Sequence, residues 1–81
     1  MFLYIGDNKI LDSKEIIGIF NLQTIEKTEE YQKIKNKLEE KHSLEKQNKK
    51  NKTMILTQEK GQEKGYFSNI SSFTIAKRNK I

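Results

Sequence analysis

The apolar residues at the start of this chain come in short clusters separated by polar turns. Residues 2–5 are an uninterrupted apolar run, which predicts a strand. The next residues, Gly6-Asp7-Asn8, have turn chemistry, because glycine and asparagine tolerate positive φ and an aspartate side chain can bond nearby backbone amides. A second short strand is predicted over residues 9–11, at hairpin distance from the first.

A third strand, with a break in its regularity, is predicted further on. Residues 12–15 hold a cap residue followed three positions later by Glu15, which predicts a single helical turn. Residues 16–22 are rich in β-branched and aromatic side chains, as in a mostly buried strand. Gly18 in the middle of this strand predicts a bulge or a close approach of backbone.

Helical spacing replaces the strand pattern in the middle of the chain. Tyr31, Ile34 and Leu38 recur at three- and four-residue spacing and form one narrow apolar stripe. Two threonines, Thr24 and Thr28, both carry the side chain that an N-cap needs. Glutamates come early and lysines later, the order that the helix dipole favours. So thin a stripe predicts a helix that lies on a sheet with most of its surface exposed.

Two more strands and a closing helix complete the pattern. The strands are predicted over residues 53–57 and 66–70, and a polar, glycine-containing loop over residues 59–65 joins them. Ser71-Ser72 offers an N-cap to a short final helix.

The sum of these elements is an α+β fold. It consists of a small curved antiparallel sheet of about five strands, one long helix over about residues 25–43 and a short C-terminal helix. No linker interrupts the pattern, so residues 1–81 are predicted to form a single domain.

Composition limits what this domain can do. Hydrophobic residues make up 33% of the chain, so a lone monomer buries little surface and self-association is expected. Cysteine is absent and His42 is the single histidine, which excludes disulfides, thiolate metal sites and a histidine-based triad. Each carboxylate can be accounted for by a turn, by helix capping or by a place on the exposed surface, which leaves no pair for acid–base catalysis. We therefore expect no enzyme, no small-molecule substrate, no metal and no other cofactor. No apolar run reaches the length of a membrane span and no secretory signal precedes the first strand, so we expect a cytoplasmic protein without a membrane partner.

The positive charge is concentrated in two short segments. The whole chain carries 16 basic and 11 acidic residues, a net charge of +5. Residues 41–52 hold five lysines and one glutamate, and Lys77, Arg78 and Lys80 form a basic tail. Such clusters have two interpretations: lysines that keep a small protein soluble, or a contact surface for a polyanion such as nucleic acid.

Three short signatures occur in a characteristic order. They are Phe-Leu-Tyr-Ile-Gly at residues 2–6, Ile-Ile-Gly-Ile-Phe at residues 16–20, and Tyr-Phe-Ser-Asn-Ile-Ser-Ser-Phe-Thr-Ile-Ala-Lys-Arg at residues 66–78. With this order and length the chain resembles the Rem-type family of extracellular-matrix and biofilm regulators of Gram-positive bacteria, in particular its RemB branch. The resemblance runs nearly end to end, apart from the helix and the basic loop.

The resemblance implies a DNA-binding transcriptional regulator. The related RemA branch is similar in fold to LytTR-type DNA-binding domains and assembles into closed rings that carry DNA around a basic rim. Its Arg-Arg-Thr-Arg stretch corresponds to Lys49-Lys50-Asn51-Lys52 here, which keeps the charge but not the bidentate geometry of arginine. The resemblance therefore implies a ring-like homo-oligomer that contacts the phosphate backbone mainly through Lys49, Lys50 and Lys52, with Lys77 and Arg78 as secondary contacts.

Two positions depart from the family pattern. Glu15 stands where the RemA branch has an arginine, and an acid at that place repels phosphate. Asn69 replaces the proline that is usual before the final Ile-Ser-Ser. Glu15 and the acidic start of the helix favour an alternative function, a non-DNA-binding assembly or protein-interaction subunit that partners a related regulator.

Overall fold

A computed structural model describes residues 1–79 of the chain and shows an α+β fold. The described residues form five strands, three α-helices and one 3-10 turn, η1. In chain order they are β1 (Phe2–Tyr4), β2 (Ile10–Asp12), η1 (Ser13–Glu15), β3 (Ile16–Asn21), α1 (Leu22–Ile25), α2 (Glu29–Glu40), β4 (Thr53–Glu59), β5 (Gln62–Ser68) and α3 (Ser72–Arg78).

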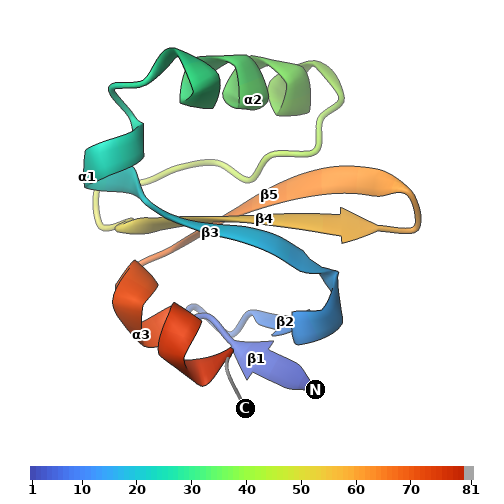
Figure 1. Cartoon of the computed structure of the whole chain (residues 1–81), viewed down its shortest axis with the longest axis vertical. Helices are drawn as coiled ribbons and strands as arrows, with labels where there is room; N and C mark the ends of the chain where they lie inside the picture. Colours follow the sequence, from blue (N-terminus) through green and yellow to red (C-terminus); the bar gives the residue numbers. More distant parts are fainter. Residues whose placement is uncertain (80–81) are drawn as a thin grey trace.

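The strands form two antiparallel sheets, and not the single five-stranded sheet that the sequence predicted. β1 pairs with β2, and β3, β4 and β5 form a separate sheet with β4 in the centre. The chain turns a corner at η1, where the Asp12 side chain accepts a hydrogen bond of 3.0 Å from the backbone N–H of Lys14. Because of this corner, β2 does not continue alongside β3. Figure 1 shows α2 over one face of the three-stranded sheet, with α3 and the β1–β2 hairpin under the other.

The predicted first hairpin is confirmed, including its turn. Gly6, Asp7 and Asn8 have φ values of 93°, 51° and 60°. The turn is closed by hydrogen bonds of 3.0 Å from Ile5 N–H to the Lys9 carbonyl and 2.9 Å from Lys9 N–H to the Gly6 carbonyl. The residue types that tolerate positive φ therefore occupy the positions that require it.

Two apolar clusters fill the two interfaces of the three-stranded sheet. The cluster toward α2 combines residues of α1, of α2 and of the two strands β4 and β5: Leu22, Tyr31, Leu38, Met54, Leu56 and Phe67. The cluster toward α3 and the hairpin contains Leu3, Ile5, Leu11, Ile55 and Ile75. β4 is buried on both sides because its alternate residues supply both clusters.

The predicted long helix over about residues 25–43 is shorter in the structure, where α2 covers only Glu29–Glu40 and a separate short helix, α1, precedes it. Thr28 adopts an extended conformation, with φ of −95° and ψ of 151°, and its side chain accepts a hydrogen bond from Tyr31 N–H at 3.2 Å. The same hydroxyl donates to the Ile25 carbonyl at 2.8 Å, so Thr28 closes α1 and begins α2. Thr24 is not a cap, since it lies inside α1, which Asn21 caps instead. At the other end α2 stops at Glu40, and His42 turns the chain with a φ of 54°.

The predicted polar loop over residues 59–65 is mostly strand. β4 and β5 extend until Glu59 pairs with Gln62, leaving a two-residue turn of Lys60 and Gly61. Their φ values of 52° and 80° are positive, as tight hairpins with right-handed strand twist require. The repeated Gln-Glu-Lys-Gly therefore has two roles, because its first copy makes this turn and its second copy lies within β5.

The predicted irregularity at Gly18 is confirmed. The register between β3 and β4 shifts between Ile16 and Gly18, which is a β-bulge. A Cβ atom on Gly18 would lie 2.6 Å from the ring of Phe20, so the glycine also makes room for that ring.

A polar network closes the hairpin end of the three-stranded sheet. The Glu59 carboxylate accepts hydrogen bonds of 2.7 Å from both the Thr57 and the Tyr66 hydroxyl, and its other oxygen lies 3.5 Å from Lys64 Nζ. The bond from Thr57, supported by those from Tyr66 and Lys64, lowers the pKa of Glu59. Burial, together with the bond to Glu59, raises the pKa of Tyr66. Both shifts favour an ionised Glu59 beside a neutral Tyr66.

We expect Glu59→Gln to lower the free energy of unfolding at pH 7 by about 1–2 kcal/mol, because hydrogen bonds to a charged acceptor are stronger than those to a neutral one. The folded pKa of Glu59 lies below its ordinary value. Its contribution is therefore fully present above about pH 4.3, the ordinary pKa of glutamate, and is lost as the pH falls through the lower folded pKa. Urea denaturation of both proteins across pH 2–7 measures this. Glu63→Gln is the control, and a wild-type advantage over Glu59→Gln that persists undiminished at pH 2 contradicts the assignment.

Candidate nucleic-acid interface

Residues 46–52 form an ordered turn that displays lysines; we call this segment the lysine loop. Asn51 N–H donates to the Asn48 carbonyl at 3.2 Å, and Asn48 N–H donates to the Asn51 side chain at 2.7 Å. The Asn48 side chain in turn accepts from Lys50 N–H at 2.8 Å. Lys49 and Lys50 occupy the two central positions of this turn and are exposed. The two asparagines thus hold the backbone while the lysine side chains point outward.

The end of the lysine loop is bonded to the end of the three-stranded sheet. Lys52 N–H donates to the Ser68 carbonyl at 2.7 Å, and the Lys52 carbonyl accepts from Leu22 N–H at 2.9 Å. The Thr53 hydroxyl donates to the Ile70 carbonyl at 2.7 Å. The loop therefore lies where β3 ends, β4 begins and β5 ends, beside α1 (Figure 1).

The lysine loop is preceded by residues 43–45, which hold its start and which we call the strap. Gly65 N–H donates to the Ser43 carbonyl at 2.9 Å and Glu45 N–H donates to the Gly65 carbonyl at 3.1 Å, so the strap pairs with the free edge of β5. A Cβ atom on Gly65 would lie 2.5 Å from Leu44 Cδ1, which explains the glycine at this position.

The carboxylate of Glu45 completes the attachment of the strap. It accepts hydrogen bonds from Phe67 N–H at 3.0 Å and from Lys9 Nζ at 2.7 Å, and Lys9 Nζ also donates to the Phe67 carbonyl at 2.7 Å. The single acid of the basic segment is therefore already paired with Lys9. It does not neutralise the lysines of the loop.

The ammonium groups of the lysine loop have no acidic partner. Within residues 1–79, ion pairs shorter than 4.0 Å join the Met1 amino group to Asp12, Lys9 to Glu45 and Lys64 to Glu59. Lys46, Lys49, Lys50 and Lys52 take part in none of them and are all exposed. Their positive charge is available to an anion in solution.

The structure separates the two groups of predicted contact residues. α3 begins next to the lysine loop, after Ile70, but Lys77 and Arg78 are in its last turn. Arg78 Nη1 donates to the Tyr4 carbonyl at 3.3 Å, which places this end of α3 beside β1. A helix of this length spans about 10 Å. Lys49, Lys50 and Lys52 thus belong to the loop before β4, Lys77 and Arg78 belong to the last turn of α3, and Lys80 lies outside the described residues.

Glu15, the acid expected from the sequence to repel phosphate, lies far from the lysine loop. Ile16 follows it at one end of β3 and pairs with Thr57, whereas Asn21 at the other end pairs with Thr53 beside the loop. At the rise of an extended strand, the five steps from Ile16 to Asn21 place about 17 Å between the two ends of β3. Glu15 therefore contributes little repulsion at the lysine loop, since that distance exceeds the screening length in physiological salt.

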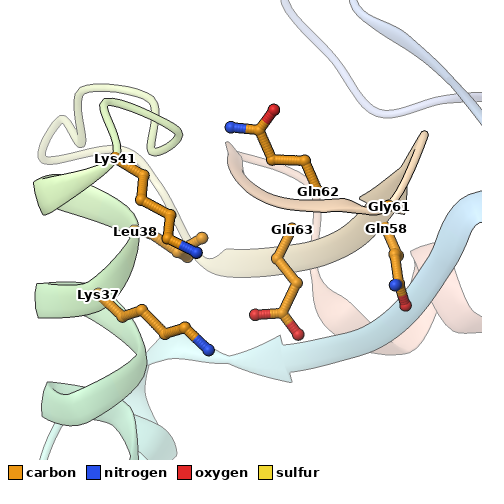
Figure 2. Close-up of a pocket in the computed structure, with 7 residues that line it drawn as sticks. All are labelled: Lys37, Leu38, Lys41, Gln58, Gly61, Gln62 and Glu63. Atoms are coloured by element: carbon orange, nitrogen blue, oxygen red, sulfur yellow. The ribbon is translucent and has the colours of Figure 1, made fainter.

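The structure also contains a polar cleft that the sequence did not indicate. A cavity of about 460 Å³ separates α2 from the β4–β5 hairpin, lined by Lys37, Leu38, Lys41, Gln58, Gly61, Gln62 and Glu63. Figure 2 shows the two lysines extending from α2 toward the hairpin, where Glu63 also points into the gap. Their four-residue spacing was the available signal. The mixture of an acid with two lysines makes this cleft a poorer phosphate site than the lysine loop.

Residues 1–79 contain no group of three or more side chains that could hold a metal ion, and no helix among them is long and apolar enough to cross a membrane. Neither the protein-family models nor the curated proteins contain a match to this chain.

Proposed function

We propose that this protein is a DNA-binding transcriptional regulator of the extracellular-matrix and biofilm type, which acts as a ring-like homo-oligomer. The observation that supports DNA binding is the lysine loop, where Lys49, Lys50 and Lys52 are exposed on or beside a hydrogen-bonded turn and have no carboxylate partner among residues 1–79. The resemblance to Rem-type regulators adds the target class and the ring-like assembly to the proposal.

Binding of this kind is dominated by the phosphate backbone. A lysine is a compact point charge, which suits phosphate but not the bidentate reading of a guanine edge. The pre-formed turn reduces the conformational entropy that binding would otherwise cost. Three phosphate contacts predict that affinity falls about 40-fold between 50 and 200 mM salt, through release of counterions.

Self-association increases the strength of such weak contacts. Once one subunit of an oligomer is bound, the next lysine loop meets the same duplex at a high effective concentration. Lys77 and Arg78 are a secondary contact in this proposal, because they lie at the far end of α3 and reach DNA only where it passes that surface.

A charge-reversal variant of the lysine loop tests the proposal. We expect Lys49→Glu with Lys50→Glu and Lys52→Glu to reduce affinity for a duplex by more than about 100-fold at 50 mM salt, because three attractive contacts become repulsive. The matched control changes Lys33, Lys37 and Lys41 on α2 to glutamate, an equal change in net charge on another surface. Gel shifts and fluorescence anisotropy over a salt series measure both. An equal loss for the two variants shows that only net charge matters, and no loss for the loop variant removes the proposal.

The alternative function is an assembly or protein-interaction subunit that partners a related regulator without touching DNA. Exposed Phe2, Tyr4 and Ile10 on the β1–β2 hairpin favour it, because large apolar side chains in solvent mark contact surfaces. Light scattering with and without duplex DNA separates the two functions: an oligomer whose mass does not change when DNA is added supports the alternative.

A further inference from the structure

The outer surface of the β1–β2 hairpin is apolar although it faces solvent. Leu3 and Leu11 point inward and are 5% and 8% exposed. The alternate residues Phe2, Tyr4 and Ile10 are 74%, 50% and 62% exposed, and Tyr4 pairs directly with Ile10 across the hairpin. We call these three residues the hairpin face.

A solvent-facing sheet surface of this composition is unusual. Antiparallel strands with one solvated face normally alternate apolar and polar residues, whereas residues 2–5 are apolar throughout. Apolar residues are scarce in this chain, at 33%, and three large ones gather on one short hairpin. The α3 and sheet layers already cover the inner side of this hairpin, so what remains uncovered is its outer side (Figure 1).

We propose that the hairpin face packs against the same face of a second copy of this chain, about a two-fold axis. This inference rests on the self-association in the proposed function and identifies the surface that produces it. An isologous contact requires a self-complementary patch, and the apolar centre of the hairpin face with an acid near one end and a base near the other meets that requirement.

The charges at the two ends of the hairpin favour one orientation of the pair. Asp12, whose carboxylate also lies 3.9 Å from its own Met1 amino group, stands opposite Phe2 at one end, and Arg78 is bonded to the Tyr4 carbonyl at the other. A two-fold axis parallel to the faces and perpendicular to the strands places opposite ends together. Asp12 then approaches Arg78 of the partner subunit, and Phe2 packs on Tyr4 of the partner subunit.

The apolar area supplies most of what a small specific contact needs. Complete burial of an aromatic side chain removes about 150–250 Å² from water, so the exposed parts of Phe2 and Tyr4 hold roughly 250 Å². With Ile10, two copies can hide up to roughly 700 Å² of apolar surface, so the polar rim has to supply the rest of the roughly 1,000 Å² that is the lower limit for a specific interface.

This pairing leaves the lysine loop accessible. The hairpin face lies on the outer side of the layer beneath the three-stranded sheet, whereas the lysine loop lies at the end of that sheet, beside α1 (Figure 1). A two-fold contact joins subunits in pairs, so a ring requires an additional head-to-tail contact between pairs. Arg78 at the rim of the hairpin face takes part in assembly in addition to any contact with DNA.

Light scattering after size-exclusion chromatography tests the pairing. We expect the wild-type chain to have an even multiple of the subunit mass, and Phe2→Ser with Tyr4→Ser to have half the wild-type mass at the same concentration. Phe73→Ser is the matched control, since Phe73 is 76% exposed on α3, outside the hairpin face, and its loss should leave the mass unchanged. Circular dichroism checks that both variants fold, which the exposure of the replaced side chains leads us to expect.

The outcomes separate this inference from DNA binding. A monomeric wild-type chain, a hairpin variant with the full wild-type mass, or equal dissociation of the Phe73→Ser control overturns the pairing. A wild-type protein that pairs through the hairpin face but does not shift DNA at low salt leaves the pairing intact and removes the DNA-binding proposal instead.

Discussion

Phe67→Ala is expected to destabilise the fold by about 3–5 kcal/mol, because it removes a large side chain that is 1% exposed from the cluster between α2 and the sheet. Small domains are stabilised by only about 5–15 kcal/mol in total. The midpoint of thermal unfolding should therefore fall by roughly 15–30 °C. Little of the cavity can close by relaxation, since Phe67 lies in β5 and both neighbours of that strand, β4 and the strap, are held by backbone hydrogen bonds.

The control for this substitution is the same change on the surface. Phe73 is 76% exposed, so Phe73→Ala should change the free energy of unfolding by no more than about 0.5 kcal/mol. Thermal and urea denaturation, followed by circular dichroism, compare the two. Equal destabilisation by both substitutions would show that the described packing around Phe67 is wrong.

Glu45→Ala is expected to cost about 2–3 kcal/mol and to release the strap from β5. The substitution removes the acceptor of Phe67 N–H and the ionic partner of Lys9, in a pair whose side chains are only partly exposed to solvent. Without the carboxylate, the edge of β5 loses its cover beyond Gly65. The start of the lysine loop should then become mobile, because the strap leads directly into it.

Hydrogen exchange and a double-mutant cycle measure this effect. Amide exchange at Gly65 and Phe67 should become faster in Glu45→Ala, while α3 exchanges as in the wild type. Combining Glu45→Ala with Lys9→Ala should reveal a coupling of about 1 kcal/mol, as expected of a partly exposed pair. Glu40→Ala on the exposed side of α2 is the control. Exchange rates unchanged at Gly65 would show that the backbone bonds of the strap suffice without Glu45.

Local pattern was enough for several elements of this fold. The turn at Gly6, the apolar stripe of Tyr31 and Leu38, and the bulge at Gly18 all depend on residues close together in the chain. In each case the signal is either the backbone preference of glycine or the regular spacing of apolar residues, and the neighbouring residues do not oppose it. The exposed lysines at residues 49, 50 and 52 were also indicated by sequence, as a cluster of charge.

Other features depend on residues distant in the chain. Thr24 and Thr28 have equal capping chemistry, but only Thr28 caps a helix. The reason is packing: α1 has to hold Leu22 in the apolar cluster, and α2 has to begin where it places Tyr31 in the same cluster. Likewise, both copies of Gln-Glu-Lys-Gly have turn chemistry, but Gly65 is in a strand because Leu44 of the strap approaches it. Periodicity carries no information about such contacts.

The sequence by itself determined the α+β class, the first hairpin, the helical stripe and the presence of a basic loop, because these follow from local preferences and spacing. Only the tertiary structure decided that the strands divide into two sheets, that Glu45 is neutralised by Lys9, and that Arg78 is bonded to the Tyr4 carbonyl of β1. It also showed that one side of the first hairpin remains in solvent. The physical reason is that burial and ion pairing also join residues distant in the chain, such as Lys9 and Glu45, which are 36 positions apart, and the free energy of such contacts depends on how the layers pack and not on neighbouring residues.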